Sequence, residues 1–397
     1  MHESLRVLVV ATKSPWPALG GGSLTLHGLL LGLVEAGVNV RVAALGPRPA
    51  GEERPPYEVI TTDRTKRRWP GLRELGGARS SFSLARYRVR ALRDLVAAQT
   101  VELAPHVVHL EQLHVGWLLH HFAARVPVVL REQNVEHVLF SRLAEVAPPR
   151  RRWLLRLEAR LLAREEARTC ARAGLVAAIS EVDAAAVRAL APAARVAVLP
   201  AAWPGGRAPA TLRLAGDPAF LCVGSFDWIA NRDGAVWLLR EVWPRIRASA
   251  PGAVLHLAGP GSESLRSADS SSVVRHGQVD DPSALFDPAC VALVPVRAAS
   301  GVRMRLLAAW DHGVPAVTSP IGGEGLVAED GDGAALAATA PEFAAAALRV
   351  ACDLELRRRL VAAGRAKLTL HAPARVAAAA IELYREVISR RGGPASR

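Results

Sequence analysis

The sequence predicts an α/β protein that contains two doubly wound parallel-sheet domains, and three observations lead to that prediction. The chain has 397 residues, which is more than one ordinary domain contains. Its first part has a strand–helix–strand pattern, with apolar runs at residues 6–11 and 39–44 on either side of a helical stretch. The same pattern begins again at residue 219, after a Pro- and Gly-rich linker at residues 202–209. Two Rossmann-like domains are therefore expected, with their ligands at the carboxyl ends of the strands.

The first half of the chain supplies the remaining elements of the first predicted sheet. Residues 23–36 form the first helix, with Ser23 as its N-cap and Gly37 as the residue that ends it. Residues 46–87 read as a loose, basic region. A helix at residues 150–173 has arginines on one side and leucines on the other. Further short strands are predicted at residues 106–110, 127–130, 175–179 and 195–199.

The second half begins with a strand and a turn that leads into a helix. The last helix, at residues 373–390, is expected to pack back on the first domain. The other predicted strands lie at residues 219–223, 254–257 and 291–295, and the other helices at residues 233–248 and within 341–367. The predicted domains are residues 1–203, residues 204–370, and a C-terminal segment at residues 371–397.

Composition excludes several classes of protein. Half of the residues are hydrophobic and 22% are charged, so a large core is expected and disorder is not. The net charge of +13 is explained most simply by arginines solvated on helix faces; a basic face for anionic lipid is the second interpretation, and nucleic acid the third. No basic and aromatic module of a known nucleic-acid type is present, so we expect no nucleic-acid partner. Dinucleotide-binding and P-loop patterns are also missing.

The cysteines and the N-terminus predict the compartment. The four cysteines are far apart and form no CxxC pair, which indicates buried thiols in a reducing environment. The N-terminus lacks the pattern of a secretory leader, and no apolar run approaches the length of a membrane span. We expect a cytoplasmic protein, with attachment to the inner membrane face left open. A metal at His109, Glu111 and His114 is weighed and set aside, because no further ligands accompany them.

The most informative stretch begins at residue 300. Ser300 and Gly301 form a turn before a helix whose first turn is predicted to carry Arg303 and Arg305, and Gly313 ends that helix. Free N–H groups at a helix start and two guanidinium groups make a site for a diphosphate. The alternative is that both arginines decorate an exposed helix. The helix dipole disfavours cations at that end unless an anion is near, which favours the phosphate site.

A second glycine turn follows the strand that begins at Ala316. Its backbone amides could approach another part of the same ligand, and Glu324 adds one carboxylate. The alternative for Glu324 is a solvated turn residue. The residues of this turn are Gly323, Glu324, Gly325 and Leu326.

Together with residues 219–231, these two turns resemble the donor-sugar site of the GT-B glycosyltransferases of family 4. The resemblance implies two Rossmann-like domains that face a central cleft, and transfer of a sugar from a nucleoside diphosphate sugar to a hydroxyl acceptor with retention. The acceptor would be a polysaccharide, glycolipid or natural product, and no metal or other cofactor is implied. The donor-binding residues implied are Gly224, Asn231, Ser300, Gly301, Arg303, Arg305, Gly323, Glu324, Gly325 and Leu326.

Two positions depart from the family pattern. Ala308 stands where the family has a glutamate that holds the ribose hydroxyls, and an alanine cannot accept those hydrogen bonds. Gln133 stands where the family has a histidine that contacts the donor sugar; glutamine still forms hydrogen bonds but does not titrate. The resemblance implies that Gln133, Asn134 and His137 face the donor sugar, with a structural role as the alternative for His137.

The resemblance also assigns the acceptor side. Gly20, Gly21 and Gly22 match the glycine-rich acceptor loop, and in relatives the first domain often binds a lipid-linked acceptor. Basic stretches at residues 64–73, 86–93 and 150–164 would suit contact with an anionic membrane. Two alternatives remain open from the departures: a non-catalytic homologue that acts as partner of an active transferase, and a site that holds the nucleotide without the ribose clamp.

Overall fold

The computed structural model describes residues 4–18, 20–47, 54–71, 80–122, 126–205 and 212–392. Four segments named above lie partly outside these ranges. They are residues 48–53 and 72–79 of the loose region at 46–87, residues 72–73 of the first basic stretch, residues 206–209 of the expected linker, and residues 393–397 of the expected C-terminal segment.

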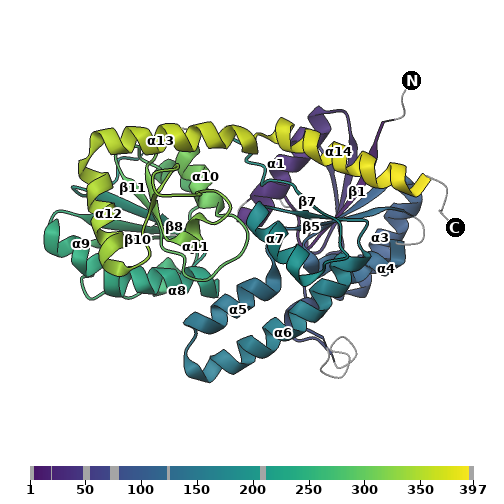
Figure 1. The fold of residues 1–397 in the computed structure, drawn as a ribbon, viewed down its shortest axis with the longest axis horizontal. Coiled ribbons are helices and arrows are strands. Elements are labelled where there is room, and N and C mark those ends of the chain that lie inside the picture. The colour runs from purple at the N-terminus through teal and green to yellow at the C-terminus, as the bar shows by residue number, and fades with distance from the viewer. Residues whose placement is uncertain are drawn as a thin grey trace. The chain divides into compact units, whose positions relative to one another are not determined.

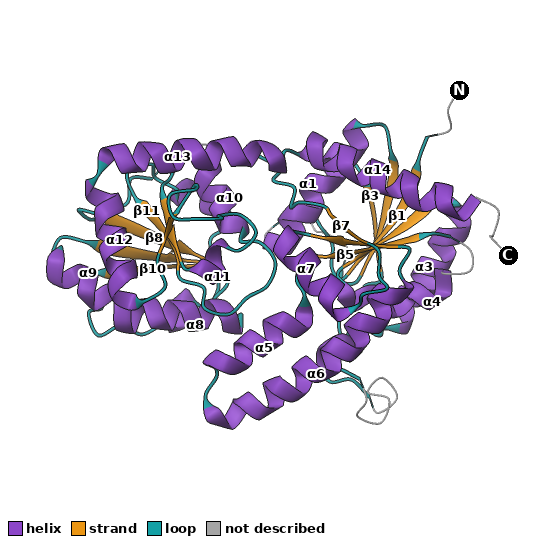
Figure 2. Ribbon diagram, in the orientation of Figure 1, coloured by secondary structure: helices purple, strands orange, loops and turns teal. Residues whose placement is uncertain are grey.

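The chain divides into two compact units, each of which contains a parallel sheet with helices on both faces (Figures 1 and 2). Unit 1 consists of Met1–Pro204 and Leu370–Arg397, and unit 2 consists of Gly205–Thr369. All strand pairs in the described residues are parallel. The prediction of two doubly wound α/β domains is confirmed.

The sheet of unit 1 has seven strands in its described part, in the order β3-β2-β1-β4-β5-β6-β7. The order reverses between β1 and β4, which is where ligands bind in folds of this kind. The strands are β1 (Arg6–Ala11), β2 (Asn39–Ala44), β3 (Glu58–Thr61), β4 (Val107–Glu111), β5 (Val128–Glu132), β6 (Leu175–Ala178) and β7 (Val196–Val198).

Helices cover both faces of this sheet. Alternate residues of β1 serve the two layers: Val7 and Val9 pack with α1 and α14, whereas Leu8 and Val10 pack with α3 on the other face. The helices of unit 1 are α1 (Gly21–Glu35), α2 (Phe82–Ala85), α3 (Arg90–Leu103), α4 (Leu119–Phe122), α5 (Glu136–Val146), α6 (Pro149–Arg172), α7 (Glu181–Leu190) and α14 (Pro373–Gly392), with 3₁₀ turns at Leu113–Leu118 and Thr369–His371.

Helix α14 comes from the end of the chain and lies in the core of unit 1. Its side chains Val376, Ala377 and Tyr384 are buried in one cluster with α1 and β1. The backbone is joined at the same place, because Trp203 N donates to His371 O at 2.8 Å. The last helix is therefore an integral layer of unit 1.

Unit 2 has a six-stranded sheet in the order β10-β9-β8-β11-β12-β13. Its strands are β8 (Ala219–Val223), β9 (Val254–Ala258), β10 (Val273–Gly277), β11 (Val291–Val294), β12 (Ala316–Thr318) and β13 (Ala335–Leu336). Its helices are α8 (Ile229–Trp237), α9 (Trp243–Ser249), α10 (Met304–Asp311), α11 (Pro320–Gly323), α12 (Ala340–Cys352) and α13 (Leu354–Leu368), with a π turn at Leu238–Val242 and 3₁₀ turns at Ser262–Ser264 and Pro282–Leu285. None of the helices in the described ranges is long and apolar enough to cross a bilayer.

Three sequence predictions were wrong in detail. Ser23 is not an N-cap, because α1 begins at Gly21 with Gly20 in the capping position and no side-chain cap. The region expected to be loose contains β3, which pairs with β2 from Arg41 opposite Glu58 onward. Strand β3 has only four residues, so the alternation of apolar and polar side chains along it is too short to be recognised in the sequence. The helix predicted from residue 233 begins earlier, at Ile229, and a π turn divides it before Trp243.

Replacing Gly32 with alanine tests the contact between α1 and α14. An added Cβ would lie 2.2 Å from Pro373 O and 2.8 Å from Ala377 Cβ, so the helices must separate. We expect Gly32→Ala to lower the free energy of unfolding by about 1–3 kcal/mol in urea titrations, in spite of the higher helix propensity of alanine. Glu35→Ala, on the exposed end of α1, is the control and should change little. A Gly32→Ala protein as stable as the control would contradict this packing.

Candidate active site

The predicted donor-binding residues of unit 2 follow three neighbouring strands. Strands β8, β11 and β12 are adjacent and parallel, so their carboxyl ends meet at one edge of the sheet. Gly224 follows β8, Ser300 and Gly301 lie between β11 and α10, and Gly323 ends the helix after β12. The fold therefore places these segments on one sheet edge.

Arg305 is the centre of a contact between two of these segments. Its guanidinium Nη2 donates to Asn231 Oδ1 at 2.5 Å, and Asn231 Nδ2 donates to Ser225 O at 2.9 Å. A Cβ on Gly224 would lie 3.2 Å from Arg305 Nη1, so the guanidinium lies directly beside the end of β8. Burial of the guanidinium group lowers the pKa of Arg305. The structure brings Gly224, Asn231 and Arg305 together.

The turn before α10 differs from the prediction at Arg303. Arg303 is the N-cap residue of α10, with extended backbone, and only Arg305 lies in the first turn of the helix. Arg303 is buried and donates from Nη2 to the carbonyl oxygen of Ser300, so it closes the turn over its own backbone. Gly301 has φ of 74°, a conformation that favours glycine, in the middle of this turn.

The second glycine turn is built on a short capped helix. Ser319 Oγ accepts a hydrogen bond from Gly322 N at 2.9 Å and donates to Val296 O, which joins the turn to the segment after β11. Gly323 ends α11, and Glu324 is its C-cap residue. Gly325 is exposed, and Leu326 is buried beneath the turn. The roles of these four residues in donor binding stay predictions.

Ala308 lies on α10, three residues after Arg305. It is 9% exposed, so its methyl group is part of the packed face of the helix. Its carbonyl oxygen accepts from His312 N at 3.1 Å at the end of the helix. Position 308 is therefore one helical turn after position 305 on α10.

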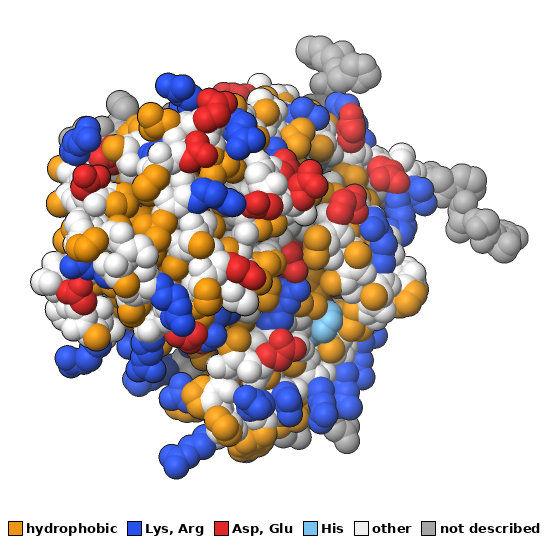
Figure 3. Space-filling model, turned by 60° about the vertical axis from the view of Figure 1, so that its left-hand side comes forward, with side chains coloured by type: hydrophobic (Ala, Val, Ile, Leu, Met, Phe, Trp, Pro, Cys, Tyr) orange, Lys and Arg blue, Asp and Glu red, His pale blue; other side chains and the backbone are white. Residues whose placement is uncertain are grey.

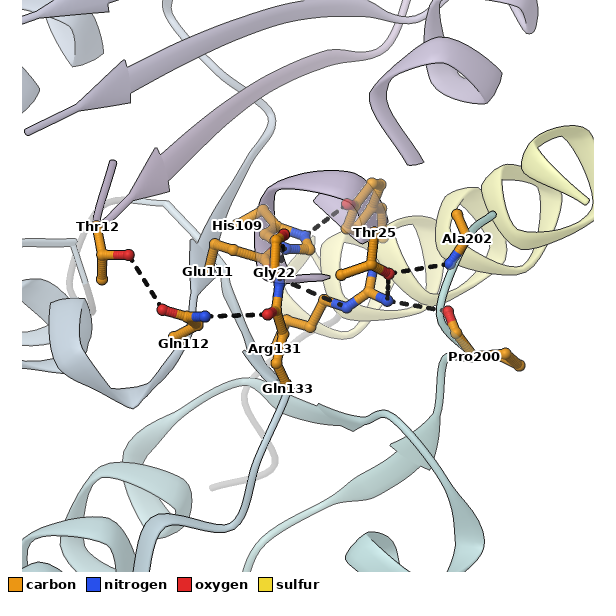
Figure 4. A network of polar contacts seen from close by, with 11 residues as sticks. Thr12, Gly22, Thr25, His109, Glu111, Gln112, Arg131, Gln133, Pro200 and Ala202 are labelled. Carbon is orange, nitrogen blue, oxygen red and sulfur yellow. Dashed lines mark hydrogen bonds and ion pairs between the residues drawn. The ribbon is translucent and has the colours of Figure 1, made fainter. Parts of the chain in front are cut away.

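Gln133 is the centre of a buried polar network at the carboxyl edge of the sheet of unit 1 (Figure 4). Its Nε2 donates to Glu111 Oε1 at 2.5 Å and to Gly22 O at 3.2 Å, and its Oε1 accepts from Gln112 Nε2 at 3.0 Å. A Cβ on Gly22 would lie 2.8 Å from Gln133 Oε1, so a side chain at this position would displace the Gln133 amide from the network. Thr12 Oγ1 completes the row by donating to Gln112 Oε1 at 3.0 Å.

Glu111 carries the negative charge of this network. Burial favours the neutral acid, but the Arg131 guanidinium and hydrogen bonds from His109 and Gln133 hold the pKa of Glu111 below its ordinary value. Arg131 Nε lies 3.8 Å from Glu111 Oε1, and His109 Nε2 lies 2.7 Å from Glu111 Oε2. His109 Nδ1 lies 2.7 Å from the Tyr384 hydroxyl of α14. The network therefore extends from the glycine turn to the last helix.

Sequence reasoning found part of this network and missed the rest. Gly22 and Gln133 were both predicted as site residues, and the structure brings them into contact. Gln112 and Arg131 were not predicted, although each lies at the carboxyl end of a predicted strand. That position on a parallel sheet was the signal available in the sequence. The φ of 74° at Gln112, which is rare for a residue other than glycine, has no signal in one sequence.

His137 and Asn134 belong to a neighbouring cluster of carboxylates. His137 Nδ1 lies 2.6 Å from Glu166 Oε2, and the backbone N–H of Glu136 donates to Glu166 Oε1 at 2.8 Å. Asn134 hydrogen-bonds Glu136. Burial and the charge of Glu166 raise the pKa of Glu136 to about 8, and burial with three neighbouring carboxylates raises the pKa of Glu132 well above its ordinary value. These contacts hold the His137 side chain at the start of α5, and its place at the donor sugar stays a prediction.

Two family models match the chain. Residues 20–202 match the model described as "Glycosyl transferase 4-like domain", and residues 217–353 match the model described as "Glycosyl transferases group 1". The two matches span most of the sheet of unit 1 and the sheet of unit 2. No curated protein sequence matches the chain.

Solved glycosyltransferase structures share the fold over nearly the whole chain. Sucrose-phosphate synthase from Thermosynechococcus elongatus has a TM-score of 0.74 and 17% identity, with 98% of this chain and 100% of that chain covered. HepE from Anabaena in complex with UDP-glucose has a TM-score of 0.62 and 14% identity, covering 97% and 99%. WaaG, a glycosyltransferase involved in lipopolysaccharide biosynthesis, has a TM-score of 0.61 and 15% identity, covering 95% and 99%. These likenesses confirm the GT-B fold.

The buried Glu136 predicts a loss of stability at alkaline pH. Its pKa is raised from 4.5 to about 8 in the folded chain, so the stability that it contributes as a neutral acid is complete at low pH. That contribution is lost as the pH rises through about 8. We expect Glu136→Gln to remove this dependence, so that the urea midpoint of the variant exceeds that of the wild type increasingly between pH 5 and pH 9.

The exposed Glu145 on the same helix supplies the control, because Glu145→Gln should follow the wild type at every pH. A difference between Glu136→Gln and the wild type that stays constant over this pH range would show that the Glu136 carboxyl is ionised in the folded protein.

Proposed function

Because the chain belongs to the group 1 glycosyltransferases, we propose that it transfers a sugar from a nucleoside diphosphate sugar to a hydroxyl acceptor. The similar structure of HepE contains UDP-glucose, which supports a nucleotide sugar as donor. The acceptor class that we propose is a polysaccharide, glycolipid or natural product. No finding favours a non-catalytic role.

The contact of Arg305 with Asn231 beside Gly224 is the observation that carries the donor assignment. Asn231 accepts from one guanidinium nitrogen and thereby fixes the direction of the side chain. Arg305 also lies in the first turn of α10, where the helix dipole disfavours a cation unless an anion is bound. We assign the diphosphate to Arg305 and the first amides of α10. Arg303, which closes the turn at Ser300, would act as a positioning residue.

The chemistry follows from the charge that develops when the glycosidic bond breaks. The sugar–phosphate bond is cleaved, the diphosphate leaves with the bonding electron pair, and a fixed guanidinium stabilises its growing charge. We propose that the new bond forms with retention and that no metal is needed, because the arginine and the helix end supply positive charge. Gln133 and Asn134 are proposed to bind sugar hydroxyls, and Gly20, Gly21 and Gly22 to form the acceptor side.

Nucleotide binding tests the donor site directly. In calorimetric titrations with UDP, GDP, ADP and TDP we expect one nucleotide to bind in the micromolar range. Arg305→Ala should weaken that binding by about 10- to 100-fold, because a hydrogen bond to a charged group is lost. Arg240→Ala removes an exposed arginine of the same unit and should leave the affinity unchanged. Folded wild-type protein that binds none of the four would overturn the proposal.

A membrane surface is the second part of the proposal, and it rests on helix α6. Trp153, Leu154 and Leu157 are 61%, 50% and 47% exposed, and Leu157 lies four and three positions after the other two, which places them on one side of the helix. Figure 3 shows hydrophobic and basic side chains side by side at the lower end of the molecule, where α5 and α6 project in Figure 1. The exposed arginines of this helix are Arg150, Arg151, Arg156, Arg160, Arg164, Arg168 and Arg172.

This pattern fits an anionic lipid surface. Apolar side chains enter the headgroup region, and each basic residue near such a surface adds about 1 kcal/mol of attraction. Among the described residues no carboxylate forms an ion pair with Arg156, Arg160 or Arg164, so their charges are available. We therefore propose peripheral attachment to an anionic membrane face through α6.

Vesicle sedimentation tests this attachment. The wild type should sediment with vesicles of phosphatidylcholine and phosphatidylglycerol, less with phosphatidylcholine alone, and less at high salt. Trp153→Gln with Leu157→Gln should reduce the bound fraction severalfold. Leu354→Gln replaces a residue that is 66% exposed on α13 and should bind like the wild type. Equal sedimentation of the wild type with neutral and anionic vesicles would exclude an electrostatic membrane contact.

A further inference from the structure

A basic pocket in unit 1 has no role in the function proposed so far. It lies between the segment after β3 and the start of α3, and it encloses about 540 Å³. This volume is within the range of small-molecule sites. The lining residues are Asp63, Arg64, Thr65, Lys66, Arg67, Val89, Arg90 and Ala91.

The pocket has an excess of positive charge. Among the described residues, four of its lining side chains are cations and Asp63 is the one carboxylate. Within the part of the chain that the structure describes, no carboxylate lies at ion-pair distance from Arg64, Lys66 or Arg90. By contrast, the nearby Arg88 pairs with Glu165 at 2.7 Å. Three of the pocket's cations, Arg64, Lys66 and Arg90, therefore form no ion pair with a described carboxylate.

Lys66 is held in place by an aromatic side chain. Its Nζ donates to the Tyr87 hydroxyl at 3.2 Å and lies 5.4 Å from the centre of the Tyr87 ring. Tyr87 is itself packed edge-on against His114, with ring centres 4.7 Å apart. An ammonium group that is fixed in this way loses less side-chain entropy when it binds an anion.

The start of α3 adds to the positive potential. Arg90 is the first residue of this 14-residue helix, Val89 is its N-cap without a side-chain cap, and its first turn has no acidic residue. The helix dipole makes the electrostatic potential at this end positive. The guanidinium of Arg90 is therefore unfavourable there in the absence of an anion. The helix end and the cations act on the same space, because Arg90 and Ala91 line the pocket.

A further cation connects the pocket with the glycine turn. A Cβ on Gly20 would lie 3.5 Å from Lys13 Nζ, so this ammonium group touches the start of α1. Desolvation and the charge of Lys66 lower the pKa of Lys13, which places the two lysines within electrostatic reach of each other. Lys13 therefore adds a positive charge beside the turn assigned to the acceptor.

We propose that this pocket binds a phosphate group on the acceptor, so that the acceptor is a hydroxyl compound with an anionic phosphate. This proposal rests on the proposed transferase function, because it specifies the chemical class of the acceptor. Arg64, Lys66 and Arg90 hold the phosphate oxygens, and Lys13 extends the binding region toward the Gly20–Gly22 turn. A phosphorylated sugar and a phospholipid headgroup share this chemistry.

Calorimetric binding of phosphates tests the proposal without any transfer reaction. The probes are inorganic phosphate, glucose 6-phosphate and glycerophosphoglycerol, the headgroup of phosphatidylglycerol. Wild-type protein should bind at least one of them, and Arg64→Gln/Lys66→Gln/Arg90→Gln should bind it at least tenfold more weakly. All three side chains are exposed, so the variant should fold, which circular dichroism checks. Tighter binding of glucose 6-phosphate than of the diester indicates a phosphorylated sugar, and the reverse indicates a lipid headgroup.

A matched variant separates the pocket from net charge. Arg240→Gln/Arg358→Gln/Arg359→Gln removes three exposed arginines of unit 2 and should keep the phosphate affinity of the wild type. If both triple variants bind phosphate equally weakly, the pocket is not the phosphate site. The same conclusion follows if folded wild-type protein binds UDP but no phosphate compound. Either result would leave the transferase proposal standing. Phosphate binding without binding of any nucleotide would overturn the transferase function, and with it the assignment of the phosphate to an acceptor.

Discussion

The parallel pairing of every described strand is the constraint on which the rest of this protein depends. Parallel strands need crossover connections, so each strand is followed by a turn on the same sheet edge and a helix that returns across a face. Glu111, Gln133, Gly224 and Arg305 come from distant parts of the chain, and all of them lie in or next to such turns. Within each unit, the topology gathers chemically useful side chains that the sequence keeps apart.

The two charged regions of unit 1 are organised in opposite ways. In the network of Gln133, the charge of Glu111 is met by Arg131 and by two hydrogen bonds, and the groups are buried. Such a network fixes the shape of a surface because each group has one favourable arrangement. The pocket at Lys66 is exposed, and Arg64, Lys66 and Arg90 have no carboxylate at ion-pair distance among the described residues. The buried network around Gln133 is suited to holding a rigid shape. The exposed pocket at Lys66 is suited to binding and releasing a ligand from solvent.

Much of the fold could be predicted because the apolar runs of buried parallel strands are continuous, as at residues 6–11, and because glycines mark the turns. The positions of Gln133 after a strand and of Arg305 at the start of a helix followed from the same pattern. The short β3 strand has exposed and half-buried residues, so its sequence carries no clear period. The inward turn of Arg303 toward Ser300 and the contact of Tyr384 with His109 depend on tertiary packing, which no local pattern encodes.

The place of α14 has a consequence for the order in which the protein can mature. The segment of unit 2 is continuous, so all of it has been synthesised before α14 emerges from the ribosome. The core of unit 1 needs Val376, Ala377 and Tyr384, and Tyr384 also supports His109 in the polar network. During synthesis the N-terminal unit is therefore completed last, against the usual order in which N-terminal domains fold first. A nascent or truncated chain that lacks its last helix has an incomplete unit 1.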